Sequence, residues 1–149
     1  MLVYRITLAK YAHRLKASGR AARWNSNDQE MIYTSSSRSL ACLENVVHRS
    51  QVGLSDYFRV LSIEIPESTS ITSIDVKRLP GQWQAFENMH ITQAIGGQWL
   101  EKAHYAVLRI PSSIIQTEFN YLLNPQHADF KQIKIVNTEP FLFDERIMR

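Results

Sequence analysis

The sequence predicts an α+β fold with a mixed, mainly antiparallel sheet and short helices. Segments with strand-like patterns outnumber helical segments and do not alternate regularly with them, as they would in a parallel α/β fold. The length of 149 residues suits a single domain spanning residues 1–149. Hydrophobic residues make up 44% of the chain and charged residues 21%, which is typical of a folded chain rather than a disordered one.

The N-terminal third contains two predicted strands separated by a long loop. Residues 2–8 are rich in β-branched and aromatic side chains, which predicts a first strand carrying Arg5. Residues 9–30 have no clean period and include the segment SGRAARWNSND, whose composition is typical of a connecting loop. Residues 31–34 are predicted to form a short strand. Long ordered loops on compact domains are often functional, so this loop is a candidate site.

A helical period follows from residue 39 to residue 51, with Ser37 as the predicted N-cap. The apolar face of this helix is predicted to contain Leu40, Leu43 and Val47. Glu44 falls on the edge of that face rather than opposite it. A carboxylate placed there loses hydration, so it needs a polar partner or a functional role.

The rest of the chain predicts further strands, one longer helix and several turns. Residues 91–102 have a helical pattern despite Gly96 and Gly97, whose lack of side chains is expected to permit close packing. Residues 83–89 are predicted to be a short helix or an irregular segment. The predicted strands are 57–65, 71–76, 105–110, 130–136 and a last strand containing Phe141 and Phe143.

The positive charge of the chain is concentrated near its N-terminus. Residues 1–49 hold eight Lys and Arg against three acidic residues, whereas the remainder holds nine against eleven. The two parts therefore carry formal charges of +5 and −2, which add to the net charge of +3. This asymmetry indicates either an anionic ligand, such as a phosphate ester or a nucleic acid, or a solvated basic face.

Several kinds of site are not supported by the composition. Cys42 is the single cysteine, so an internal disulfide is excluded and a reducing compartment is the simplest setting. The five histidines lack ligand spacing, and we predict no metal site. The glycines form neither a phosphate loop nor a dinucleotide fingerprint. Neither a signal region nor a membrane-spanning run is present, so we expect a soluble, cytoplasmic protein.

Candidate functional side chains cluster around the long loop, and each also has a structural interpretation. Arg20 and Arg23 present planar donor groups suited to phosphate or carboxylate, although loop arginines are often only solvated. Trp24 and Tyr33 are suited to stacking on a ring of a ligand, or to packing in the core. Ser112 follows a strand and a proline, where its hydroxyl either contacts a ligand or stabilises a turn.

Seven short motifs occur in order along the chain: VYRI at 3–6, RWN at 23–25, IYTS at 32–35, LACLE at 40–44, IPSS at 110–113, EFNYLLNP at 118–125 and FDER at 143–146. Together they resemble the RES domain family, the toxins of Xre–RES toxin–antitoxin pairs. The resemblance runs over essentially the whole chain. One departure is the reduced glycine content of residues 18–22, which precede the RWN triplet.

The resemblance implies a fold similar to ADP-ribosyltransferase toxins and an enzyme that cleaves the nicotinamide–ribose bond of NAD by hydrolysis or phosphorolysis. NAD is then the substrate, and no metal is implied. The family's arginine, glutamate and serine correspond to Arg23, Glu44 and Ser112. Tyr33 corresponds to an aromatic member, and Arg5 matches another recurrent arginine.

These residues suit the chemistry that the resemblance implies. Cleavage of the bond develops positive charge on the ribose, which the carboxylate of Glu44 would stabilise. Arg23, with Arg5 or Arg20, would hold the pyrophosphate. Tyr33 would stack on the nicotinamide, and Ser112 would position a ribose or nicotinamide group. Trp24 is a further candidate for ring stacking.

The resemblance also implies a cognate Xre-type helix-turn-helix antitoxin that covers the active site, while a homodimer is left open. Contact with a membrane is not expected. Two other functions remain as alternatives. One is a protein ADP-ribosyltransferase, which differs only in the acceptor. The other is a nucleic-acid-binding module that uses the basic N-terminal third, although the sequence contains no known reader motif and direct nucleic acid binding is not expected.

Overall fold

The computed structural model describes residues 1–48 and 57–148, which form one seven-stranded sheet with two α-helices. The helices are α1 (Arg38–His48) and α2 (Met89–Lys102). The strands are β1 (Leu2–Leu8), β2 (Ile32–Ser35), β3 (Phe58–Glu64), β4 (Ile71–Ser73), β5 (Val107–Pro111), β6 (Phe119–Leu123) and β7 (Lys134–Phe141). Short 3₁₀ segments are η1 (Ala9–Tyr11), η3 (Val76–Arg78), η4 (Phe86–Asn88), η5 (Ala128–Gln132) and η6 (Glu145–Met148).

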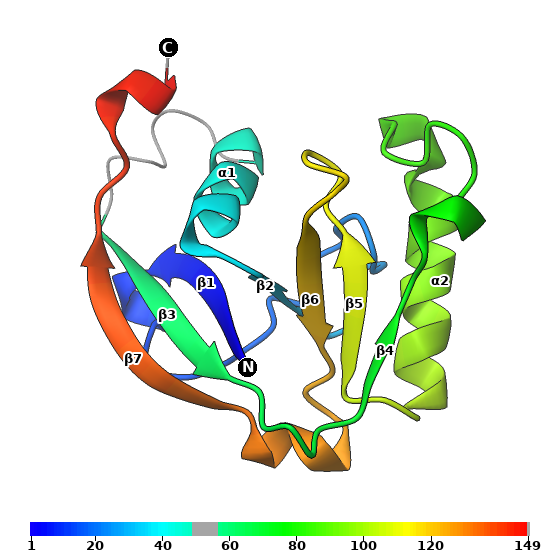
Figure 1. The fold of residues 1–149 in the computed structure, drawn as a ribbon, viewed down its shortest axis with the longest axis horizontal. Coiled ribbons are helices and arrows are strands. Elements are labelled where there is room, and N and C mark those ends of the chain that lie inside the picture. The colour runs from blue at the N-terminus through cyan, green and yellow to red at the C-terminus, as the bar shows by residue number, and fades with distance from the viewer. Residues whose placement is uncertain (49–56, 149) are drawn as a thin grey trace.

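The sheet has the order β4-β5-β6-β2-β1-β3-β7, so β2 joins two three-stranded halves (Figure 1). All neighbouring strands are antiparallel except β4 and β5, which are parallel. The predicted mixed, mainly antiparallel sheet is therefore confirmed. Because β2 is central, side chains on it are within reach of residues from both halves.

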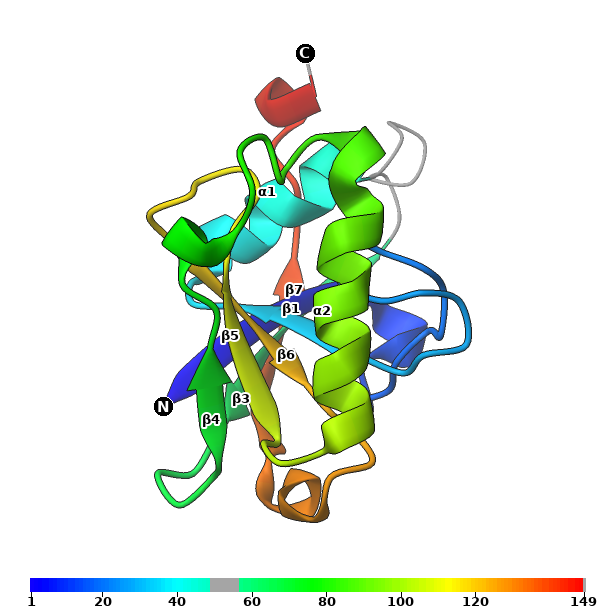
Figure 2. The same ribbon diagram turned by 90° about the vertical axis from the view of Figure 1, so that its right-hand side faces the viewer.

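Two apolar clusters fix the helices against the sheet. Helix α1 packs on the half containing β1 and β3, and helix α2 packs on the half containing β5 and β6; Figure 2 shows α2 from its solvent side. The α1 cluster contains Ile6, Ala41, Phe58, Val60 and Phe143. The α2 cluster contains Trp24, Met31, Leu79, Trp83, Trp99, Leu108, Ile110 and Leu122. A third cluster, which includes Val3, Ile32, Leu61 and Leu123, covers the opposite face of the sheet.

Helix α1 begins as the sequence predicts, but its buried face differs. The hydroxyl of Ser37 accepts a hydrogen bond from the Leu40 amide at 3.0 Å, which confirms the predicted N-cap. Val47 is 57% exposed, so its predicted burial is wrong. The helix instead contacts the α1 cluster through Ala41, Cys42 and Val46. Its buried face is therefore rotated about the helix axis relative to the predicted face. The predicted helix end at residue 51 lies outside the described residues.

The C-terminal strands differ more from the prediction. Residues 119–123 form β6, for which no strand was predicted, and it lies between β5 and β2. Residues 130–132 belong to η5 rather than to a strand, because the Asp129 amide donates to His127 Nδ1 and starts a 3₁₀ turn. Phe141 and much of the preceding predicted strand belong to one strand, β7, which pairs with β3 across a bulge at Ser62 and Ile63. Phe143 lies beyond the end of β7, so its predicted place in a strand is wrong.

The glycine pair in α2 permits a close approach, as predicted. A Cβ atom added to Gly96 would lie 1.8 Å from the backbone oxygen of Trp24. The long loop therefore rests directly on the helix backbone at this point. A Cβ atom on Gly97 would meet only the end of the Gln29 side chain, at 3.0 Å.

Gly96→Ala is expected to destabilise the protein by about 1–3 kcal/mol, since the new methyl group displaces backbone rather than a flexible side chain. Gly97→Ala is the matched control, because Gln29 can move and alanine favours the helix by about 1 kcal/mol. Urea unfolding of both variants measures the difference. Equal stability of the two variants would contradict the close contact between Gly96 and the loop.

Candidate active site

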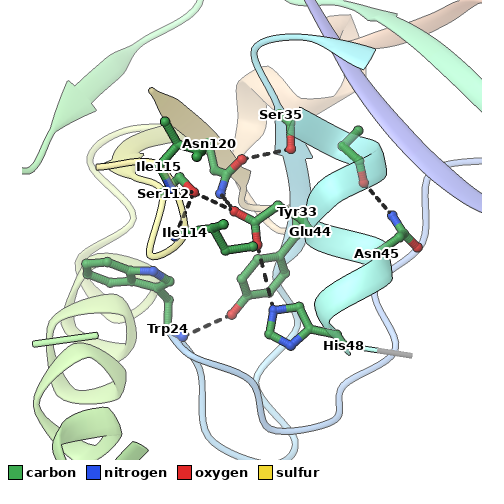
Figure 3. A network of polar contacts seen from close by, with 11 residues as sticks. Trp24, Tyr33, Ser35, Glu44, Asn45, His48, Ser112, Ile114, Ile115 and Asn120 are labelled. Carbon is green, nitrogen blue, oxygen red and sulfur yellow. Dashed lines mark hydrogen bonds and ion pairs between the residues drawn. The ribbon is translucent and has the colours of Figure 1, made fainter. Parts of the chain in front are cut away.

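Glu44 projects from α1 toward the ends of β5 and β6, where it meets a set of polar side chains (Figure 3). Its Oε1 atom accepts hydrogen bonds from the Ser112 hydroxyl at 2.9 Å and from the Asn120 amide at 2.7 Å. Its Oε2 atom lies 3.7 Å from Nε2 of His48. The Glu44 side chain is 19% exposed. One carboxylate oxygen is thus held by the protein, and the other faces the rim of the site.

The environment keeps the Glu44 carboxylate ionised. Burial raises its pKa, because the charged form loses hydration. Hydrogen bonds from His48, Asn120 and Ser112, with the charge of His48, lower the pKa and prevail over burial. The net pKa lies below the ordinary value for glutamate, so the group is a carboxylate at neutral pH.

Ser112 is fully buried, and the turn after β5 fixes its orientation. Its oxygen accepts hydrogen bonds from the Ile114 and Ile115 amides, each at 3.1 Å. Its single hydroxyl hydrogen is directed to Glu44. The Ser112 hydroxyl therefore uses its hydrogen and both of its lone pairs within the protein. It stabilises the turn, which was one of the two predicted roles, and it also contacts Glu44.

Asn120 is a site residue that sequence reasoning missed. The Ser35 hydroxyl donates to its Oδ1 atom at 2.7 Å, which orients the amide so that the nitrogen faces Glu44. Asn120 is 8% exposed and Ser35 is 4% exposed, so the link is protected from water. The available signal was a polar amide inside the otherwise apolar or aromatic run FNYLL, since buried amides need partners.

Tyr33 connects β2 to the long loop. Its hydroxyl donates to Oδ1 of Asn25 at 2.6 Å and accepts from the Trp24 amide at 3.1 Å. Burial raises the pKa of the Tyr33 phenol. The Trp24 hydrogen bond and the Arg23 charge lower it by less, so the net pKa lies above the ordinary value for tyrosine. Tyr33 is thus a neutral phenol whose hydroxyl is committed to the loop. Asn25, which is 2% exposed, is a second residue that sequence reasoning left without a role.

Arg23 lies in the same neighbourhood as Tyr33 and Glu44. Its guanidinium donates from Nη1 to the Trp83 carbonyl at 3.4 Å and is partly buried. Burial lowers the pKa of Arg23, whereas the charge of Glu44 and the nearby Tyr33 side chain raise it. Arginine stays charged even so. The structure therefore brings together the predicted guanidinium, phenol and carboxylate, with Ser112 behind the carboxylate.

The other three candidate residues are placed differently. Arg20 is exposed at the start of the loop. Trp24 is 2% exposed and packs against Trp83 with ring centroids 5.9 Å apart, so its ring belongs to the core. Arg5 shares a face of β1 with Val3, which packs in the cluster on the face opposite α1. The strand alternation thus directs Arg5 away from Glu44, and a ligand contact for Arg5 stays a prediction.

The arrangement favours a ligand that combines an anion with a centre of developing positive charge. A fixed carboxylate stabilises a cation, and a nearby guanidinium binds phosphate. In the described part of the chain, no group of three or more His, Cys, Asp or Glu side chains is placed to hold a metal ion. Within the same residues, no helix is long and apolar enough to cross a membrane.

Comparisons with known proteins agree on one family. A family model described as RES domain matches residues 2–144. Toxin Res of Photorhabdus laumondii is 36% identical over 100% of this chain and 98% of its own length. The Prs ADP-ribosylating toxin of a Sphingobium species is 37% identical over 85% of this chain and 80% of its own length.

A solved structure supports the fold. A chain from the crystal structure of the M. tuberculosis MbcT–MbcA toxin–antitoxin complex superposes with a TM-score of 0.75. The match covers 95% of this chain and 84% of the other, at 16% sequence identity. At that identity the comparison shows a shared fold.

Asn120→Leu is expected to raise the pKa of Glu44, because it removes a hydrogen bond to the carboxylate at similar side-chain volume. The titration of the Glu44 carboxyl carbon, followed by NMR, measures the shift. Asn137→Leu on the exposed strand β7 is the control and leaves this titration unchanged. An unaltered Glu44 titration in Asn120→Leu would show that the amide does not stabilise the ionised form.

Proposed function

The chain belongs to the RES domain family, and we propose that it is the toxin of a bacterial toxin–antitoxin system that consumes NAD by cleaving its nicotinamide–ribose bond. Relatives named as toxins, at 36% and 37% identity, support the toxin assignment. The observation that carries the proposed chemistry is the ionised, partly exposed carboxylate of Glu44, which Ser112, Asn120 and His48 contact and which lies near Arg23.

In this proposal, Glu44 stabilises the ribose as the glycosidic bond breaks. The bonding electron pair leaves with the nicotinamide nitrogen, which becomes neutral, and positive charge develops on the ribose as an oxocarbenium ion. Oε2 of Glu44 faces this charge, while Ser112 and Asn120 hold Oε1. Because the leaving pyridinium is already cationic, it needs no general acid. Water or phosphate then adds to the ribose carbon and completes hydrolysis or phosphorolysis.

Arg23 binds the pyrophosphate in this proposal, and Arg20, which is exposed on the same loop, adds positive charge. The excess positive charge of residues 1–49 favours the approach of an anionic substrate. The ring of Tyr33 is assigned to the nicotinamide end, because its hydroxyl is already occupied by Asn25 and Trp24. We assign Ser112 to the support of Glu44 rather than to direct substrate contact, since its hydroxyl is saturated.

Glu44→Gln is expected to lower the rate of NAD cleavage by about 100- to 1,000-fold, because it removes the charge that stabilises the transition state. Release of nicotinamide from NAD by purified protein, with and without phosphate, measures the rate. Glu101→Gln on the exposed side of α2 is the control and keeps wild-type activity. Background cleavage by the wild-type protein, or equal rates for wild type and Glu44→Gln, would refute the proposal.

The second candidate is transfer of ADP-ribose to a protein, and the similarity to the Prs ADP-ribosylating toxin of a Sphingobium species favours it. The same site serves both reactions, since only the acceptor differs. Adding bacterial cell extract to the cleavage assay and analysing its proteins by mass spectrometry separates them. ADP-ribose on a protein, dependent on Glu44, supports transfer, whereas free ADP-ribose or its phosphate supports NAD breakdown.

An antitoxin partner is part of the proposal, because the structural neighbour comes from a toxin–antitoxin complex. We propose an Xre-type helix-turn-helix protein that covers the site around Glu44 and Arg23. Where a helix-turn-helix protein is encoded beside this chain, its addition is expected to stop NAD cleavage at about equimolar amounts. Full activity of a purified complex of the two proteins would contradict a covered active site.

A further inference from the structure

Three consecutive carbonyl groups of the long loop rest on one side of α2. The Gln93 amide donates to the Ala22 carbonyl at 2.9 Å. The Thr92 hydroxyl donates to the Arg23 carbonyl. The Trp24 carbonyl occupies the space left by the missing side chain of Gly96. This set of contacts, which we call the α2 clamp, fixes the backbone on both sides of Arg23.

Thr92 is the best-protected member of the clamp. It is fully buried, and its hydroxyl also lies 3.0 Å from the Met89 carbonyl of the preceding turn. A threonine hydroxyl often bonds back to its own helix in this way. Here the single hydrogen of that hydroxyl is shared between the Met89 carbonyl and the shorter contact to the Arg23 carbonyl, 69 residues away in sequence. Removing it would leave a buried loop carbonyl without this donor.

The loop is held from its other side by β2. The Tyr33 hydroxyl accepts from the Trp24 amide and donates to Asn25. The Asn25 amide in turn donates to three loop carbonyls, those of Arg20, Ser26 and Gln29, at 2.9, 3.0 and 3.2 Å. The backbone from residue 22 to residue 25 is thus fixed between a helix and a strand.

We propose that Thr92 and Gln93 are positioning residues for Arg23, which fix its guanidinium before the anionic part of the substrate binds. The hydrogen bonds that orient the Glu44 carboxylate come from Ser112 and Asn120 rather than from Thr92 or Gln93. An arginine on an unrestrained loop loses conformational entropy when it captures an anion, and restraint in the free protein reduces that loss. This inference rests on the proposed function, because it assigns the pyrophosphate of NAD to Arg23.

The two parts of the site therefore affect different kinetic constants. Loss of the clamp releases Arg23 and weakens substrate binding, while the carboxylate that stabilises the transition state stays in place. Thr92→Val and Gln93→Leu are each expected to raise KM for NAD about tenfold and to leave kcat within about twofold. Thr92→Ser keeps the hydroxyl and is expected to keep a KM close to that of the wild type.

The experiment measures KM and kcat for NAD cleavage by the full-length wild type and the three variants. Gln98→Leu, an exposed position on the same helix, is the matched control for Gln93→Leu and is expected to behave as wild type. Simple destabilisation would lower the active fraction and hence the apparent kcat at constant KM. Gln93→Leu carries the test alone if Thr92→Val does not fold, because Gln93 is only partly buried.

The outcomes separate this inference from the proposed function. Wild-type cleavage together with unchanged KM in Thr92→Val and Gln93→Leu overturns the positioning role and leaves the proposed function intact. An equal rise of KM in Thr92→Ser also overturns it, since the hydroxyl would then be irrelevant. A wild-type protein that neither binds nor cleaves NAD refutes the proposed function and this inference with it.

Discussion

The structure depends on one carboxylate oxygen that joins three elements. Oε1 of Glu44, on α1, accepts hydrogen bonds from the Ser112 hydroxyl in the turn after β5 and from the Asn120 amide on β6. Removing a carboxylate from water is unfavourable unless hydrogen bonds replace the lost hydration. Ser112 and Asn120 are 68 and 76 residues from Glu44 in sequence, so the folded sheet is what supplies these bonds. The same bonds add a polar link from α1 to the half of the sheet containing β5 and β6, whereas the apolar α1 cluster packs the helix on the half containing β1 and β3.

Strand β2 links this carboxylate to the arginine loop. Tyr33 and Ser35 are two residues apart, so they lie on the same face of the strand. Ser35 orients Asn120, which holds Glu44. Tyr33 holds Trp24 and Asn25, the two residues that follow Arg23. A short strand between the two halves of the sheet thus sets the spacing of the anionic and cationic groups. A change in the register of β2 would displace both of them together.

Local pattern was sufficient for some of these features and insufficient for others. The first strand, the N-cap at Ser37 and the edge position of Glu44 follow from periodicity and capping within a few residues. Strand β6 was missed because its place depends on pairing with β5 and β2, which are distant in sequence. Asn120 was missed for the same reason. Its role becomes visible only when β6 lies opposite α1, and the contacts of Thr92 with the loop likewise depend on tertiary packing.

The donors that hold Glu44 suit a carboxylate that must act on a cation. A directly paired lysine or arginine would also lower the pKa, but its charge would cancel much of the negative field at the reacting carbon. His48, asparagine and serine together lower the pKa of Glu44, and asparagine and serine do so without adding a charge. His48 lies at the exposed rim, 3.7 Å from Oε2, and its side chain is 61% exposed. The backbone around Arg23 is held by a separate set of contacts from α2 and β2. Under the proposed function, the group assigned to phosphate and the group assigned to the ribose are therefore oriented by separate sets of hydrogen bonds.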